Sequence, residues 1–104
     1  GAVMAHPLSV AAAETLSGNR TLTNAEILEA QIWTFDPAAA RDLTLPAASA
    51  TNKGIVLYIA NTADAADVLT IKDGVGTICT PTQNESAIVW STGSVWDGGT
   101  VTSS

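Results

Sequence analysis

The chain is 104 residues long, carries a formal net charge of −6, and has only 13% charged residues against 46% hydrophobic ones. This size fits one domain, and the high apolar fraction argues against disorder of the chain body, since disorder requires low hydropathy and high charge. The longest apolar run, at about residues 55–60, is far shorter than the roughly 20 residues of a membrane-spanning helix. The four basic residues are scattered singly, which argues against nucleic-acid partners and against docking on an anionic membrane.

Residues 1–18 differ in composition from the rest of the chain. They carry no charge before Glu14 and are rich in small residues. Such a segment packs poorly alone, so we expect an extended N-terminal arm that is mobile or lies on a neighbour. Val3, Leu8 and Val10 are its candidate contacts with a partner or with another subunit.

The next segment combines a helix signal with a strand signal. Thr23 and Glu26 have the spacing of a capping box, in which each side chain binds the free backbone N–H of the other residue. This spacing predicts a short helical turn over residues 24–29. Residues 31–35 are β-branched and aromatic, which predicts a strand that ends at the following Asp-Pro turn.

Short β-type runs separated by turn signals fill the second half of the chain. Their spacing of about eight to twelve residues is typical of a β-sandwich or barrel. We therefore predict an all-β fold: a single small β-sandwich or jelly-roll-like domain over residues 19–104, with one short helical turn and the extended arm. The expected strands cover residues 43–45, 54–60, 68–72, 77–80, 86–90 and 95–96.

The run at residues 54–60 is continuously apolar, which is typical of a central strand covered on both faces. A chain of this size with so little charge needs more cover than it provides itself. We therefore expect a homo-oligomer, and specifically a homotrimer. The predicted buried residues, in the subunit or at its interfaces, are Ile55, Leu57, Ile59, Leu69, Ile71, Ile88 and Trp90.

Few residues are candidates for catalysis or metal binding. His6 is the only histidine and lies in the arm, and the single Cys79 has no basic sequence neighbour to activate its thiol. We predict no enzyme activity, no catalytic residue, no metal site and no cofactor. Asn61, Asp64 and Asp67 crowd one loop and offer oxygen ligands for calcium, although a polar turn is the favoured interpretation.

The three tryptophans divide into two kinds by their neighbours. Trp33 and Trp90 lie inside apolar strand segments, which predicts a place in the core or at a subunit interface. Trp96 flanks a glycine-rich turn together with Asp97. These two residues are the candidates for an exposed interface.

Several segments, in their order, resemble small virion proteins of tailed bacteriophages, including capsid decoration (cement) proteins and related modules of head or tail fibres. The segments are 20–28 (RTLTNAEIL), 39–48 (AARDLTLPAA), 54–61 (GIVLYIAN), 69–77 (LTIKDGVGT) and 85–96 (ESAIVWSTGSVW). They span about three-quarters of the chain, whereas residues 1–18 have no counterpart. The resemblance implies a β-rich fold, frequent trimers, attachment to a capsid or tail, and no catalytic residues to carry over.

The sequence thus predicts a structural virion protein that binds and stabilises a phage capsid as a homotrimer. Its partners would be itself and the major capsid protein, and its location the capsid surface after synthesis in the bacterial cytoplasm. The alternative is a receptor- or carbohydrate-binding module of a tail or head fibre. That module would use Trp96 with the loop residues Asn61, Asp64 and Asp67.

Overall fold

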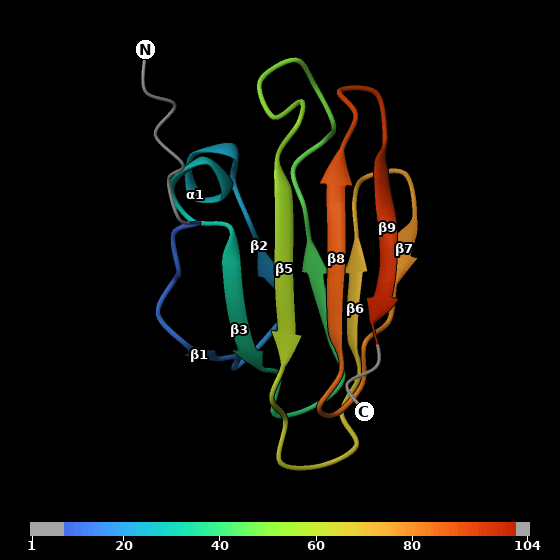
Figure 1. The fold of residues 1–104 in the computed structure, drawn as a ribbon. Coiled ribbons are helices and arrows are strands. Elements are labelled where there is room, and N and C mark those ends of the chain that lie inside the picture. Colours follow the sequence, from blue (N-terminus) through green and yellow to red (C-terminus); the bar gives the residue numbers. More distant parts are fainter. Residues whose placement is uncertain (1–7, 102–104) are drawn as a thin grey trace.

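The computed structural model describes residues 8–101, which form two β-sheets and one short helix (Figure 1). The protein is mostly β, as predicted. A five-stranded sheet has the order β1-β3-β5-β8-β9, and a four-stranded sheet has the order β2-β4-β6-β7. In chain order the elements are β1 (Glu14–Thr15), β2 (Arg20–Thr21), α1 (Asn24–Glu29), β3 (Ile32–Asp36), β4 (Arg41–Thr44), β5 (Val56–Asn61), β6 (Leu69–Lys72), β7 (Thr77–Cys79), β8 (Ser86–Ser91) and β9 (Trp96–Val101).

The chain crosses between the sheets after each of its first five strands. One crossing reverses the chain direction and the next restores it, so β1, β3 and β5 run parallel in one sheet, and β2, β4 and β6 in the other. The pairs β5–β8, β8–β9 and β6–β7 are antiparallel. Because jelly rolls join antiparallel strands, the pairing of the first six strands differs from the jelly-roll-like arrangement that the sequence suggested.

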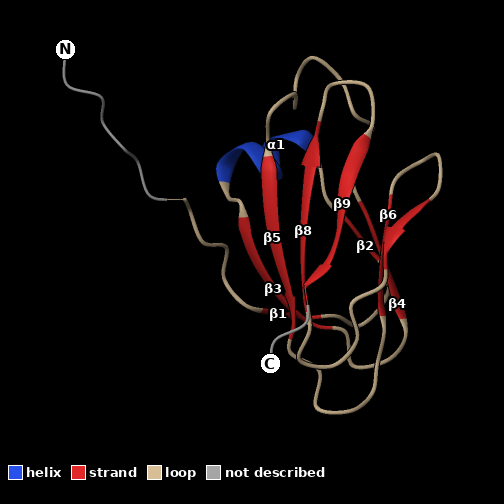
Figure 2. Cartoon of the chain, turned by 45° about the vertical axis from the view of Figure 1, so that its right-hand side comes forward, coloured by secondary structure: helices blue, strands red, loops and turns tan. Residues whose placement is uncertain are grey.

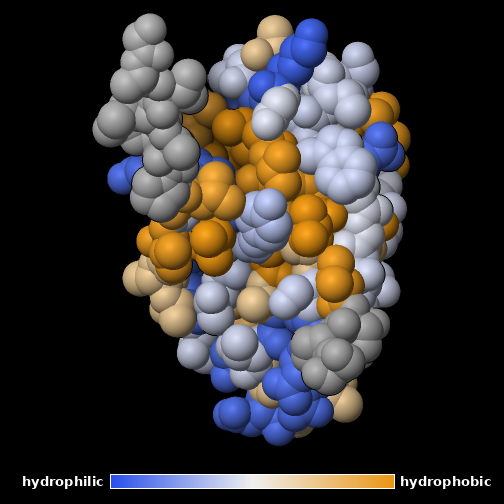
Figure 3. All heavy atoms as spheres, viewed as in Figure 1, coloured by the Kyte–Doolittle hydropathy of each residue, from blue (hydrophilic) through white to orange (hydrophobic). Residues whose placement is uncertain are grey.

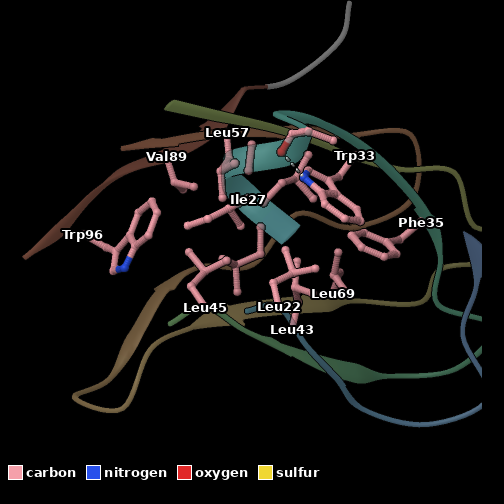
Figure 4. Packing of buried hydrophobic residues seen from close by; sticks show 14 of the residues in the cluster. Leu22, Ile27, Trp33, Phe35, Leu43, Leu45, Leu57, Leu69, Val89 and Trp96 are labelled. Carbon is pink, nitrogen blue, oxygen red and sulfur yellow. Dashed lines mark hydrogen bonds between the residues drawn. The ribbon is translucent and has the colours of Figure 1, made fainter. Parts of the chain in front are cut away.

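The hydrophobic core lies between the two sheets, with side chains from both pointing toward one another (Figure 4). Buried and part-exposed residues alternate along β3 and β6, as the period-2 geometry of a strand requires. Four predicted core residues on β5 and β6 are buried as expected. The buried hydrophobic set comprises Leu16, Leu22, Ile27, Trp33, Phe35, Leu43, Leu45, Leu57, Ile59, Leu69, Ile71, Ala87, Val89 and Trp96, with Ala30 and Ala63 beside them.

The helix α1 has the predicted bounds and lies at one end of the sheets (Figure 2). Its capping box is formed: the Glu26 N–H donates to Thr23 Oγ1 at 3.2 Å, and the Thr23 N–H donates to Glu26 Oε1 at 2.9 Å. Ile27 is fully buried in the core. Trp33 Nε1 donates to the Ala30 carbonyl at 3.0 Å, which ties the end of the helix to β3.

The long connection between β4 and β5 is held by Asn52, whose side chain is fully buried. Its Nδ2 donates to Asn24 Oδ1 and to the Ala47 carbonyl, both at 2.9 Å. Its Oδ1 accepts from the Ser49 N–H at 3.0 Å and from Ser91 Oγ at 2.6 Å. A single amide group therefore joins this connection to both α1 and β8.

Within residues 10–16, Val10 and β1 pair with β3 of the same subunit. Val10 forms a parallel bridge with Ile32, and β1 pairs in parallel with the end of β3. Leu16 is buried in the core. The prediction of an arm extending to residue 18 is wrong for this stretch, because the edge of β3 offers unpaired backbone groups and the core has a place for Leu16. Val3 lies outside the described residues.

Strand β5 is covered on one face only, which corrects the expectation of cover on both. Leu57 and Ile59 are buried on its inner face, whereas Tyr58 is 39% exposed on the opposite face and Val56 is half-buried. The four-stranded sheet covers only the inner side of the five-stranded sheet (Figure 2). Within one subunit the outer side of β5 therefore remains in contact with water.

Candidate functional site

The described part of the chain offers little of the chemistry that enzymes use. Among residues 8–101, no group of three or more His, Cys, Asp or Glu side chains could hold a metal ion. Within the same range, the structure contains no helix of the length and hydropathy needed to cross a membrane. His6 lies outside the described residues. The candidate site is instead an apolar surface.

This surface is the outer face of the five-stranded sheet, made by the outward side chains of β3, β5, β8 and β9. Strand pairing aligns them in rows, and Tyr58, Trp90 and Val101 are exposed. Figure 3 shows the hydrophobic residues gathered across the middle of this side of the molecule. The rows are Val56–Trp90–Asp97, Ile32–Tyr58–Ile88–Gly99 and Thr34–Ala60–Ser86–Val101.

The outer side of the four-stranded sheet has the opposite character. The residues that flank the buried Leu43 and Ile71 there are polar, as in Asp42 on β4 and Lys72 on β6. Lys72 Nζ and Asp42 Oδ2 form an ion pair at 3.2 Å across the two strands. One sheet of this protein is therefore polar toward water as usual, whereas the other presents aromatic and aliphatic groups, which is typical of an interaction surface.

A shallow hollow of about 390 Å³ lies on the outer face over β8 and β9, lined by Ile88, Trp90 and residues 97–101. Gly99 opens this hollow, because a Cβ added there would meet no atom within 4 Å. Gly98 has a different role: its φ is +131°, and an added Cβ would collide with the Ile88 carbonyl oxygen. Gly98 permits the close approach of β9 to β8, while Gly99 leaves the surface concave.

The structure places Trp90 and Trp96 on opposite faces of the five-stranded sheet. Trp96 was the candidate for an exposed interface, yet only 5% of it is exposed, and its Nε1 donates to the Pro46 carbonyl at 2.7 Å. Trp90, predicted for the core or for a subunit interface, does not lie in the core: it is 41% exposed on the outer face. The reason is that side chains alternate between the two faces along a strand. Trp90 pairs with Asp97, so both point outward, and Trp96, which directly precedes Asp97 on β9, points inward. Asp97 is exposed, as predicted.

The candidate arm contacts lie at the other edge of the same sheet. Leu8 and Val10 are both exposed, and the bridge of Val10 with Ile32 extends the middle row of the outer face by one position. The backbone of Ser9 accepts hydrogen bonds from the N–H groups of Gln31 and Ile32. This segment therefore adds to the sheet of its own subunit, whereas the sequence suggested a contact with a partner or with another subunit.

Where β5 passes into the loop that follows it, the side chain of Asn61 is not free to bind calcium or a sugar. The Asn61 side chain is buried, and its Nδ2 donates to the Asp67 and Pro81 carbonyls at 2.9 and 3.1 Å. Its Oδ1 accepts from the Ala63 N–H at 3.0 Å. Both ends of the amide are occupied within the subunit. Asp64 is exposed, and the occupied amide of Asn61 favours the polar-turn interpretation.

A charged cluster beneath the N-terminal segment has a structural role. Arg20 binds Glu14 and Glu26, with N–O distances of 2.8 Å to each, and its guanidinium lies 6.0 Å from the Trp33 ring centre. Hydrogen bonding to Arg20 lowers the pKa of Glu26 to about 2, and the same two carboxylates raise the pKa of Arg20. The cluster joins β1, β2 and α1, and its charges satisfy one another.

Two further features of a kind often found in functional sites, a free cysteine and a glycine-rich hairpin, have structural explanations within the subunit. Cys79 is half-buried, and burial raises the pKa of its thiol, which makes it a poor nucleophile at neutral pH. The glycine-rich hairpin after β6 is closed by Asp73, whose Oδ1 accepts from the N–H groups of Val75 and Gly76, both at 2.9 Å. The backbone donors that a phosphate loop would offer are therefore occupied.

No family model, curated protein or solved structure matches this chain. The resemblance to phage virion proteins therefore stays a prediction. The feature that the structure offers is a largely apolar outer face, with Tyr58 and Trp90 exposed and a hollow at Gly99.

Proposed function

We propose that this protein is a structural virion protein of a tailed bacteriophage, a capsid decoration protein that binds and stabilises the capsid as a homotrimer. The observation that carries the proposal is the apolar outer face of the five-stranded sheet. Small monomeric proteins rarely expose several large apolar side chains on one surface. Here Tyr58, Trp90 and Val101 are all exposed on this face. Classification of the two-sheet domain as a β-sandwich belongs to the same proposal.

The mechanism of such a protein is mechanical. Each trimer clamps neighbouring capsid subunits, and many repeated weak contacts resist the internal pressure of packaged DNA. The net charge of −6 keeps free copies soluble before assembly. No residue has to perform chemistry, in keeping with a site made of apolar side chains and backbone.

Co-sedimentation with expanded capsids that lack the protein tests this proposal. We expect saturable binding with a fixed number of copies per capsid, and a higher melting temperature of the decorated shell. Asp64→Asn, which removes one exposed carboxylate from the loop after β5, is a control that should bind like the parent. Absence of binding to capsids of any maturation state contradicts the proposal.

A second candidate is a carbohydrate-binding module of a tail or head fibre, and the exposure of Trp90 beside Tyr58 favours it. Aromatic rings that face water on one surface are suited to stacking on sugars. The site differs from the one that the sequence suggested, because Trp96 is buried and the Asn61 amide is occupied. A glycan array separates the candidates: a decoration protein binds capsids and leaves the array empty.

A further inference from the structure

We propose that the outer face of the five-stranded sheet is the contact between copies of this chain, with a rotation axis that runs alongside β8. In this arrangement Tyr58 of each copy packs into the Gly99 hollow of the next. The inference rests on the proposed homotrimer and names the surface that forms it. It leaves other surfaces of the trimer to bind the capsid.

The side chains on either side of β8 differ in size in a regular way. Each row of the face has one member on β5 and one on β9, at the same level along the strands. In the middle row a large Tyr58 is matched by Gly99, and in the next row a small Ala60 is matched by Val101. In both rows, a large side chain on one strand therefore lies at the same level as a small residue on the other strand.

A rotation about an axis parallel to β8 preserves the level of every row. It brings the β5 half of one copy against the β9 half of the next, so Tyr58 meets the hollow at Gly99, and Ala60 meets Val101. Ile88 and Trp90, on β8 itself, then lie nearest the axis and pack against their counterparts. Asp97 lies in the end row and is exposed, so its carboxylate stays hydrated at the edge of the contact.

Charge favours a second copy over a partner of different chemistry. Of the outward positions on β3, β5, β8 and β9, only Asp36 and Asp97 carry charge, and both lie in end rows. Two copies that each carry −6 repel one another, and a face with charge only in its end rows is where that repulsion is least. A basic partner would instead be recognised by the acidic residues elsewhere on the surface.

Disulfide trapping tests the contact. In a Cys79→Ala background, Tyr58→Cys and Gly99→Cys are combined. Within one chain these positions are two strands apart, about 10 Å between Cα atoms, which exceeds the span of a disulfide. Any bond between the introduced thiols must therefore join two copies. The Gly99 position accepts a side chain without a clash, so the variant should fold.

We expect the oxidised double variant to run as a covalent trimer of about 32 kDa, three times the 10.6 kDa chain. The matched control replaces Gly99→Cys with Gly74→Cys, at a hairpin of the other sheet that is equally open, and should give no trimer. Gly99→Glu, which fills the hollow with a charged group, should shift the mass from light scattering from about 32 to 10.6 kDa.

Three results overturn the inference: a parent protein that is monomeric at tens of micromolar, equal cross-linking in the Gly74→Cys control, or an unchanged mass for Gly99→Glu. The proposed function fails differently. A cross-linked trimer that does not sediment with capsids refutes decoration and leaves the contact intact. A monomer that binds capsids refutes the contact and leaves decoration standing.

Discussion

Replacement of Asn52 by aspartate should destabilise the fold strongly, although it changes one NH₂ group to oxygen. Nδ2 of Asn52 donates to Asn24 Oδ1 and to the Ala47 carbonyl, both at 2.9 Å, in a fully buried site. In Asn52→Asp, a carboxylate oxygen replaces this NH₂ group, so Asn24 Oδ1 and the Ala47 carbonyl oxygen both lose their hydrogen-bond donor. Each buried polar group without a partner costs about 1–3 kcal/mol, so we expect a loss of about 2–6 kcal/mol in the free energy of unfolding.

A loss of this size is a large part of the roughly 5–15 kcal/mol that stabilises a domain. It should also depend on pH. Burial and the two facing oxygens raise the pKa of the introduced carboxyl, so the folded state holds a proton that the unfolded chain releases near pH 4. The variant should therefore approach the parent in stability below about pH 4 and fall behind it as the pH rises.

Urea unfolding at pH 4 and pH 7 measures both effects. Asn19→Asp is the matched control, because Asn19 is exposed and its Oδ1 accepts from the Asp42 N–H at 3.0 Å, a function that aspartate retains. We expect its midpoint to stay close to that of the parent. If Asn52→Asp unfolds at pH 7 at the same urea concentration as Asn19→Asp, the Asn52 network does not hold the β4–β5 connection.

Three further predictions follow from the positions of particular groups. Trp96→Ala should lower the free energy of unfolding by about 3–5 kcal/mol, whereas Trp90→Ala should act mainly on association; urea unfolding at low concentration and light scattering distinguish them. Glu26 has a pKa of about 2 when folded against an ordinary 4.5, so its stabilisation is present above about pH 4.5 and is lost as the pH falls toward 2. Glu26→Gln, which keeps a capping side chain, should flatten that acid limb in melts followed by circular dichroism. Deletion of residues 1–7 should leave the melting temperature unchanged, whereas deletion through residue 16 removes the buried Leu16 and should lower it by several degrees.

The local signals in the sequence predicted the elements well where one physical cause dominated. The capping box of Thr23 and Glu26 gave the bounds of α1, because two backbone donors are satisfied only at that spacing. Alternation gave the buried positions of β6, where Leu69 and Ile71 point inward. In each case the signal lay within a few residues of the element that it described.

The predictions failed where the outcome depended on distant parts of the chain. Which of Trp90 and Trp96 points inward depends on strand parity across a tight turn, and both are flanked by similar residues. No local pattern in the sequence marks Asn52 as buried, because its hydrogen-bond partners lie up to 39 residues away along the chain. The place of Leu16 in the core likewise depends on the edge of β3, which the composition of the N-terminal segment does not reveal.

The outer faces of the two sheets carry the functional information in this chain. The inner faces must be apolar for the domain to fold, so Leu57 or Ile71 would be needed whatever the protein does. Outward positions have no such requirement, and on the four-stranded sheet they carry the Asp42–Lys72 ion pair. Tyr58, Ile88 and Trp90 occupy equivalent positions on the other sheet, where threonine or lysine would serve the fold equally well. Their presence there is the observation on which the proposed contact between copies rests, so that contact, and not any single polar group, is the first feature to test.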